Sequence, residues 1–241
     1  MDANRDKLFQ HVEFLTTLRP FRNYQNLESL QKVCRYLKGE FDKYGLETVE
    51  QKFDAEGSEY KNIIASYNPV KQRRVIVGAH YDVCGDQPGA DDNASAVAGL
   101  LEVARMVAEA KPNIDYRIDF VAFCLEEPPF FATQQMGSYI HADSINEFKR
   151  DVIGLINFEM IGFFHDGDQV YPDPRMREIY PRKANFIAVA QHAKAAAAQD
   201  FAAWEQAVHE HADDLFERQE ARRGRSDAAC GRLARRPGGR P

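Results

Sequence analysis

The sequence has few cysteines, no long apolar run and no strong excess of charge of either sign. Its four cysteines show no CxxC spacing, so buried free thiols are expected and a disulfide framework is not. No apolar stretch approaches the roughly 20 residues that a membrane helix needs. The net charge of -6 is modest and gives no reason to expect nucleic acid as a partner. The polar N-terminus lacks the apolar core of a signal peptide, which predicts a cytoplasmic protein.

Apolar strands alternate with amphipathic helices over most of the chain. Helices are predicted over residues 5–18, from Leu27 to Tyr44 with Gly45 as a left-handed cap, and from Asn93 to just before Pro112. Strands are predicted over residues 46–53, 62–67, 75–82, 118–124 and 152–158. A chain of 241 residues fits one α/β domain with a sizeable core. We therefore expect a mostly parallel or mixed central sheet flanked by helices on both faces.

The predicted strand 75–82 ends in polar residues. His80 is a potential metal ligand, and Asp82 is placed to hold the second ring nitrogen of His80 and to fix its tautomer. A short Gly/Pro loop then leads to Asp91, a second potential ligand, at the start of a helix. Because ligands in open α/β sheets lie beyond the carboxyl ends of the strands, this is the expected place for chemistry.

Two further predicted strands also end in acids. Residues 118–124 lead into Glu126 and Glu127, and residues 152–158 lead into Glu159. Glu127 and Glu159 supply carboxylates that zinc accepts as ligands. Glu126 is adjacent to a proposed ligand, which suits general acid/base work because that task requires a carboxylate near the metal but not on it.

Each of these motifs also has a purely structural interpretation. A His-x-Asp pair such as His80 and Asp82 is often a hydrogen-bonded pair without a metal. Acidic doublets are commonly solvated loop charges, and the stretch 91–93 can serve as the N-cap region of the following helix. The recurrence of such residues at successive strand ends is what favours a metal site.

The same residues resemble the zinc-dependent exopeptidases of the M28 type, a family of aminopeptidases and related amidohydrolases. The matching motifs come in the order of the family: Gly78-Ala79-His80-Tyr81-Asp82, Gly89-Ala90-Asp91-Asp92-Asn93-Ala94-Ser95, Leu125-Glu126-Glu127-Pro128-Pro129-Phe130-Phe131 with Met136-Gly137-Ser138, and Ile156-Asn157-Phe158-Glu159-Met160-Ile161-Gly162. The resemblance covers about residues 5–190 and implies a zinc-exopeptidase-like α/β domain over residues 1–190.

The resemblance implies a role for each polar residue at the strand ends. Glu126 would act as the general base, and Asp82 would orient His80. Glu159 stands where the family usually has aspartate. The metal ligands would be, in chain order, His80, Asp91, which would bridge two ions, Glu127 and Glu159.

The sequence departs from the family after about residue 190. The family closes its site with a histidine in a Ser-Asp-His motif, but here Ser226-Asp227 is followed by Ala228. Residues 191–241 are rich in alanine and arginine and are predicted to form a loosely packed helix followed by a disordered basic tail. Such an ending resembles an out-of-frame reading of a GC-rich gene. That hypothesis fails if neither of the other two frames encodes Ser-Asp-His followed by an aromatic residue.

Loss of the late histidine would affect two metal positions unequally. The first position would keep three protein ligands, His80, Asp91 and Glu159, which is enough for a catalytic zinc. The second would keep only Asp91 and Glu127 and would hold its ion weakly. His192, His209 or His211 would be the substitutes, although a histidine on a polar helix is more often solvated. The fold would also lack its last strand, and the uncovered sheet edge would favour self-association into a homo-oligomer.

The sequence thus predicts a zinc metallo-aminopeptidase, with one or two zinc ions, that acts on short peptides or related amides and that the missing histidine would impair. The alternative is a catalytically inactive family member that binds peptides or a partner protein. Acyl transfer of the glutaminyl cyclase type is disfavoured because it also uses the late histidine. No nucleic-acid or membrane partner is expected, since only the arginine-rich tail would support nucleic-acid binding.

Overall fold

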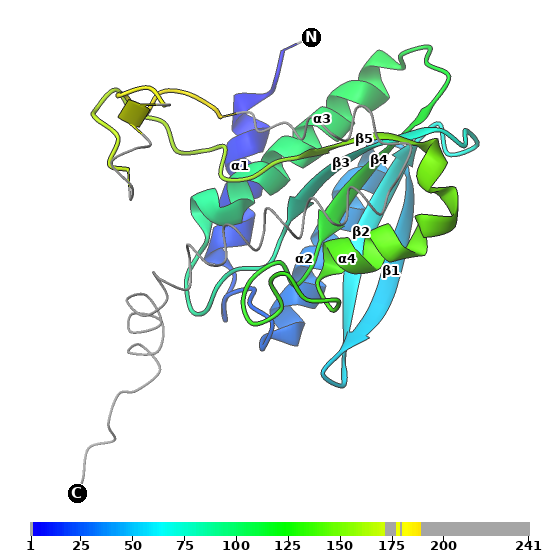
Figure 1. Cartoon of the computed structure of the whole chain (residues 1–241), viewed down its shortest axis with the longest axis horizontal. Coiled ribbons are helices and arrows are strands. Elements are labelled where there is room, and N and C mark those ends of the chain that lie inside the picture. The colour runs from blue at the N-terminus through cyan, green and yellow to red at the C-terminus, as the bar shows by residue number, and fades with distance from the viewer. Residues whose placement is uncertain (1, 172–176, 179, 189–241) are drawn as a thin grey trace, which may run out of the picture. The chain divides into compact units, whose positions relative to one another are not determined.

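A computed structural model describes residues 2–171, 177–178 and 180–188, all of which belong to the compact unit Met1–Gln191 (Figure 1). The predicted tail, residues 191–241, lies outside the described residues, and so do His192, His209 and His211. The domain division near residue 190 and the replacement of the late metal ligand therefore stay predictions.

Helices and strands follow the predicted alternation. In chain order they are α1 (Arg5–Thr17), α2 (Leu27–Lys43), β1 (Glu47–Ala55), β2 (Ser58–Tyr67), β3 (Arg74–His80), the π-helical turn η1 (Ala90–Ser95), α3 (Ala96–Ala110), β4 (Arg117–Phe123), α4 (Gly137–Ser144), the 3₁₀ turn η2 (Asn146–Asp151) and β5 (Val152–Asn157). Gly45 follows α2 with a φ of 74°, in the predicted left-handed conformation. The sequence pattern does not predict α4, and it places the start of β2 at Asn62 although the strand begins at Ser58.

The five strands form one mixed sheet in the order β1-β2-β4-β3-β5. β1 and β2 are an antiparallel hairpin whose turn residues, Glu56 and Gly57, both have positive φ, as the favoured two-residue hairpin turn requires. β2 is antiparallel to β4, whereas β4, β3 and β5 run parallel to one another. The predicted mixed sheet is confirmed, and the carboxyl ends of β3, β4 and β5 meet at the same end of it.

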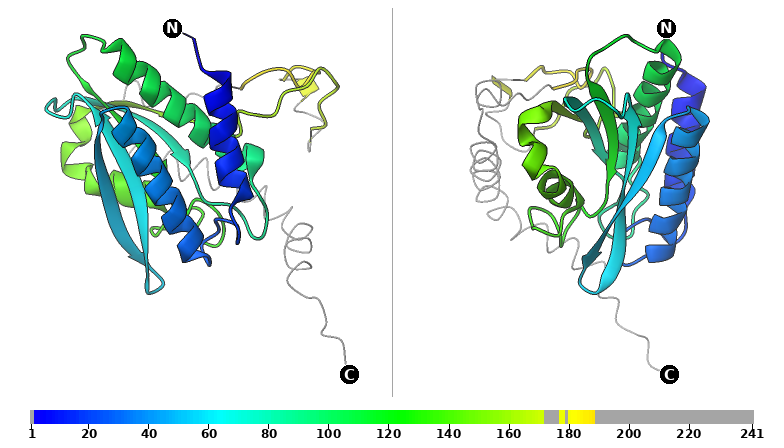
Figure 2. Two further views of the ribbon diagram at one scale, coloured as in Figure 1. Left: turned by 180° about the vertical axis from the view of Figure 1, so that it is seen from behind. Right: turned by 90° about the vertical axis from the view of Figure 1, so that its right-hand side faces the viewer.

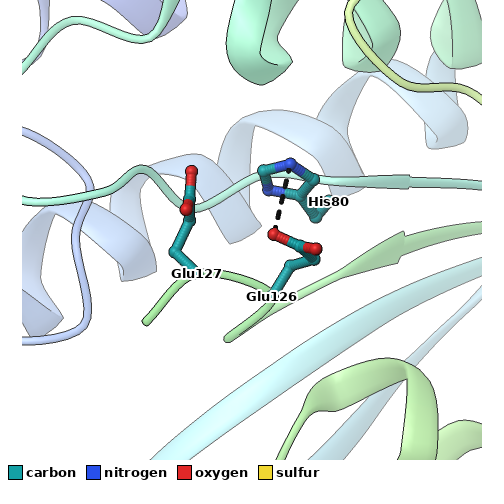
Figure 3. A group of neighbouring side chains, drawn as sticks. All are labelled: His80, Glu126 and Glu127. Carbon is teal, nitrogen blue, oxygen red and sulfur yellow. Dashed lines mark ion pairs between the residues drawn. The ribbon is translucent and has the colours of Figure 1, made fainter. Parts of the chain in front are cut away.

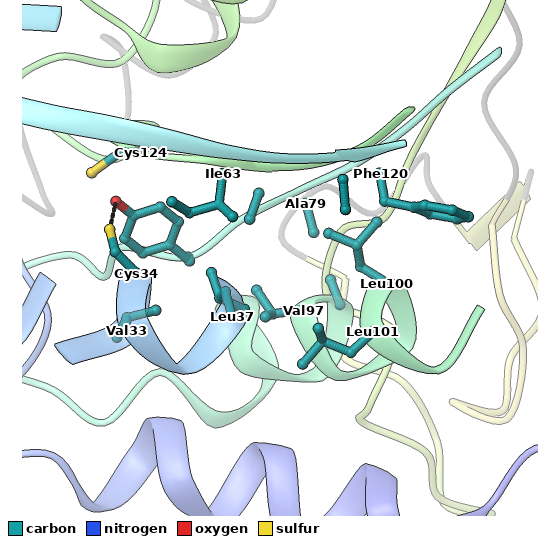
Figure 4. Close-up of a cluster of buried hydrophobic side chains, with 14 of the residues drawn as sticks. Val33, Cys34, Leu37, Ile63, Ala79, Val97, Leu100, Leu101, Phe120 and Cys124 are labelled. Carbon is teal, nitrogen blue, oxygen red and sulfur yellow. Dashed lines mark hydrogen bonds between the residues drawn. The ribbon is translucent and has the colours of Figure 1, made fainter. Parts of the chain in front are cut away.

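Helices cover both faces of the sheet, as predicted (Figure 2). α1, α2 and α3 lie on one face, where the main core contains the fully buried Leu37, Leu100 and Phe120 (Figure 4). α4 lies on the other face, where a smaller cluster includes Val121 and Phe123. None of the helices in the described part of the chain has both the length and the apolar character of a membrane span.

β5 forms one edge of this sheet. It pairs with β3, and no other described strand pairs with its outer side. The apolar side chains of Ile153, Leu155 and Ile156 are 46%, 43% and 53% exposed. Within the described residues β5 is therefore an uncovered apolar edge, the feature from which self-association is predicted. The predicted absence of a last strand concerns residues beyond those described.

Candidate metal centre

His80 is the last residue of β3 and lies at the centre of the site. It pairs with Phe123 of β4 and is only 3% exposed. Asp82 is 1% exposed and accepts the backbone N–H groups of Glu126 and Glu127, each at 3.1 Å. One oxygen of Asp82 lies 3.5 Å from His80 Nδ1, the nitrogen that it is predicted to hold. Asp82 therefore joins the end of β3 to the loop after β4, and it contacts His80 on the side of the ring opposite Nε2.

Three carboxylates surround the other ring nitrogen, His80 Nε2. This atom is 3.2 Å from Asp92 Oδ1, 3.4 Å from Glu159 Oε1 and 3.7 Å from Glu126 Oε2. Figure 3 shows the side chains of Glu126 and Glu127 next to the ring of His80. The potential ligand atoms lie within 4.8 Å of one another in each of two groups, His80–Glu126–Glu127 and His80–Asp92–Glu159. The ends of β3, β4 and β5 thus bring together four of the predicted residues: His80, Glu126, Glu127 and Glu159.

Asp92, and not the predicted Asp91, is the aspartate that lies beside His80 Nε2 in the structure. Asp91 belongs to neither group of the described residues; its Oδ1 accepts the N–H of Gly162 at 2.8 Å and the hydroxyl of Ser95 at 3.3 Å. Asp92 is the acid that faces His80, because its φ of -98° and ψ of 96° interrupt the helical turn η1. Ser95 donates its hydroxyl to the Asp91 carbonyl at 2.7 Å as well, so Asp91 is held within the turn.

Asn93 is fully buried and holds Glu159 in place. Its Nδ2 donates to Glu159 Oε2 at 3.1 Å and to the Phe158 carbonyl at 3.2 Å, while its Oδ1 accepts the Met160 N–H at 3.0 Å. Met160 has a φ of 48°, a conformation uncommon for residues other than glycine. Sequence reasoning considered only a capping role for Asn93 and missed this contact, because the partners lie far apart along the chain.

The loop after β4 places two acids where burial disfavours their charged forms. Leu125, just before them, is fully buried and has a φ of 62°, the kind of backbone strain that clusters at functional sites. Burial and the charges of nearby acids raise the pKa of Glu126 to about 7 and that of Glu127 to about 8. Glu127 Oε1 is buried and has no hydrogen-bond donor among the described residues.

The charges of this site fit a divalent cation. Burial lowers the pKa of His80, but contacts with Asp82, Asp92 and Glu159 prevail and raise it well above its usual value. Imidazole and carboxylate are both ligands that zinc accepts. The convergence of acids on Nε2 fits an ion held by His80, Asp92 and Glu159. The buried, unpartnered oxygen of Glu127 is a further candidate ligand in the group that this residue forms with His80 and Glu126.

Comparison with known proteins places the chain in a family. Peptidase family M28 matches residues 62–232 of the chain. The match begins inside β2, after α1, α2 and β1, and continues well past residue 190. The match therefore starts later than the predicted resemblance over about residues 5–190 and ends further toward the C-terminus.

Individual proteins are also similar to the chain. The uncharacterized protein YfbL of Escherichia coli K12 is 41% identical over 198 residues, which are 78% of this chain and 59% of that protein. A Zn-dependent exopeptidase from Parabacteroides distasonis aligns with a TM-score of 0.57 and 25% identity, over 70% of this chain and 65% of its own. A glutaminyl cyclase from Tannerella forsythia aligns with a TM-score of 0.52 and 26% identity over the same shares of the two chains. The chain spans less than two thirds of each of these proteins, and it belongs to peptidase family M28.

Proposed function

We propose that the chain is a metal-dependent exopeptidase of the aminopeptidase type, which removes N-terminal residues from short peptides. The observation that carries the proposal is the approach of Asp92, Glu159 and Glu126 to His80 Nε2 at the shared end of β3, β4 and β5. Family membership and the likeness to a Zn-dependent exopeptidase support the same class of reaction.

Four residues would hold the ion: His80, Asp92, Glu127 and Glu159. Zinc, when bound there, would lower the pKa of water and polarise the substrate carbonyl. Asp82 contacts Nδ1 of the His80 ring, and Asn93 fixes one oxygen of Glu159. His80 is the sole imidazole in either ligand group of the described residues, so we expect one tightly held ion per chain.

Glu126 is the residue best placed to move the proton. Its Oε2 lies 3.7 Å from His80 Nε2, and its side chain is 29% exposed, so substrate can reach it. A pKa of about 7 suits a group that must accept and return a proton at neutral pH. Glu126 would take a proton from the attacking water and pass it to the departing amine. It ionises more readily once a cation is held by its neighbours.

The outer side of the site suits a substrate with a free amino terminus. The side chains of Asp92 and Glu159 are 39% and 45% exposed, so they are reachable from solvent beside the buried His80. A cluster of carboxylates attracts the ammonium group of a peptide and so favours binding of its N-terminal end. Removal of the terminal residue follows from that orientation.

The test combines metal content with hydrolysis of aminoacyl anilides and short peptides. We expect the full chain to bind zinc and to hydrolyse these substrates slowly, and we expect Glu126→Gln to keep the zinc and lose the hydrolysis. Glu13→Gln is the matched control, because Glu13 is exposed on α1. A purified chain that takes up no zinc and shows no zinc-dependent hydrolysis would contradict the proposal and favour a non-catalytic, peptide-binding family member.

A second candidate is acyl transfer at an N-terminal glutamine, which the likeness to a glutaminyl cyclase favours. Both reactions need an ion and a carboxylate that moves a proton, so the site alone fits either. Mass spectrometry of a peptide with N-terminal glutamine separates them. Aminopeptidase action releases free glutamine, whereas cyclisation leaves the chain intact and releases ammonia.

A further inference from the structure

Arg22 lies between α1 and α2 and is fully buried. Its guanidinium donates four hydrogen bonds, all to backbone carbonyl oxygens: Tyr81 at 2.7 Å, Leu15 at 3.0 Å, Pro88 at 2.6 Å and Gly89 at 2.8 Å. Burial of a cation is costly unless its donors are satisfied. Here the donors are satisfied mainly by the backbone of one loop.

That loop, residues 81–89, connects two of the proposed metal ligands. His80 directly precedes it, and Asp92 follows it within η1. Three of the four carbonyls bound by the Arg22 side chain belong to it. The backbone carbonyl of Arg22 also accepts the N–H of Val83 at 3.2 Å. Arg22 thus bonds to both ends of the segment that links His80 to Asp92, and to Val83 near its start.

The neighbouring residues leave this loop little freedom. Asn23 Nδ2 donates to the Gly85 carbonyl at 2.8 Å. Gly89 has a φ of 57°, and a Cβ at this position would collide with the carbonyl of Asp92 and the side chain of Val83. The absence of a side chain at Gly89 lets the loop pass close to the guanidinium and to the carbonyl of Asp92.

The charge of Arg22 also acts on the site. Burial lowers the pKa of Arg22 to about 10, and the charges of Asp82, Asp92 and Glu127 oppose that shift. The guanidinium therefore stays protonated at neutral pH, and its positive charge offsets part of the repulsion among these acids.

We propose that Arg22 is a positioning residue of the metal centre, which fixes the separation of His80 and Asp92 by binding the carbonyls of loop 81–89. The inference rests on the proposed function. Arg22 lies outside the part of the chain that matches the family, residues 62–232. The N-terminal segment would thus be a working part of the site and not only a cover for the core.

The test measures zinc affinity in the full chain by competition with a chromophoric chelator, and the visible spectrum after substitution with cobalt(II). The variants are Arg22→Met and Arg22→Lys. Arg74→Met is the matched control, because Arg74 is also buried but lies at the opposite end of β3 from His80, where it pairs with Asp119 at 3.5 Å. Thermal melts show at which temperatures each variant is folded.

We expect Arg22→Met to lower zinc affinity by about 10- to 100-fold, the range for loss of a group that orients a ligand, and to alter the cobalt spectrum. Arg22→Lys should recover part of both, because it keeps the charge but not the fork of donors. Arg74→Met should lose stability and keep its zinc affinity. If Arg22→Met does not fold, Arg22→Lys decides by the same two readouts.

Two results would overturn the inference, and they are distinguishable. Folded Arg22 variants that bind zinc like the unsubstituted chain, with an unchanged cobalt spectrum, would reject the positioning role and leave the proposed function intact. Failure of the unsubstituted chain to bind zinc or cobalt would reject the proposed function and the inference together.

Discussion

The two adjacent aspartates of η1 offer a sharp test of the site, because the same substitution should lower zinc affinity at one position and stability at the other. Asp92 lies 3.2 Å from His80 Nε2 and is the proposed ligand. Asp91 instead accepts hydrogen bonds from Gly162 and Ser95. Asparagine has nearly the shape of aspartate and keeps an oxygen acceptor, so Asp91→Asn and Asp92→Asn change charge with little change in packing.

Asp92→Asn removes one charged ligand. Loss of a group that only orients a ligand typically lowers metal affinity by about 10- to 100-fold, and loss of a ligand should cost more. We therefore expect zinc affinity to fall by more than about 100-fold, or roughly 3 kcal/mol. Asp91→Asn leaves an acceptor for the N–H of Gly162, which lies 2.8 Å away. It weakens a charged hydrogen bond to a neutral one, which costs about 1 kcal/mol and lowers the melting temperature by roughly 2–4 °C. Its metal affinity should stay within a few-fold.

Zinc affinity by chelator competition and thermal melting of the metal-free chain provide both quantities for both variants. The unsubstituted chain is the reference, and each variant serves as the control for the other. Loss of zinc binding in Asp91→Asn together with its retention in Asp92→Asn would refute the assignment of Asp92 and favour Asp91, the residue predicted from the motif alone.

Three further predictions concern protons and the support of the ligands. Zinc binding to the metal-free chain should release protons near neutral pH, because the pKa of His80 is raised and that of Glu127 is about 8. Calorimetry in buffers of different ionisation enthalpy should then show a heat of binding that depends on the buffer. A heat that is the same in all buffers would contradict this. Burial lowers the pKa of His141 to about 4. At a pH below the ordinary pKa of histidine, the His141 side chain therefore takes up a proton when the chain unfolds. Its contribution to stability is therefore complete above about pH 6.5 and falls by roughly 3 kcal/mol as the pH drops to about 4; urea unfolding of His141→Leu should lack this loss, and an equal pH dependence in both proteins would count against it. Asn93→Ala should lower zinc affinity by about 10- to 100-fold because Glu159 loses its donor; chelator competition measures this, and an unchanged affinity would exclude the supporting role.

Strand ends were the part of the site that sequence reasoning could predict. Three apolar runs, each followed by a histidine or an acid, become β3, β4 and β5, and their parallel pairing brings His80, Glu126, Glu127 and Glu159 to one end of the sheet. Side-chain alternation and apolar length are local properties of the sequence. Parallel neighbours then place their carboxyl ends together without further information.

The choice between adjacent residues could not be made in the same way. Asp91 and Asp92 differ by one backbone step, and which of them faces the site depends on the non-helical dihedral angles of Asp92 within η1. Arg22 was missed for a related reason. Its partners in loop 81–89 are about 60 positions away and are backbone carbonyls, which carry no residue-type signal.

X-ray diffraction from crystals of the zinc-loaded chain, collected at the zinc absorption edge, tests the central claim most directly. We expect an anomalous peak about 2.0–2.2 Å from His80 Nε2 and from a carboxylate oxygen of Asp92, with Glu159 or Glu127 completing the ligands. Zinc that is absent from this place, or that is bound elsewhere in the chain while His80 keeps only its carboxylate contacts, would contradict it.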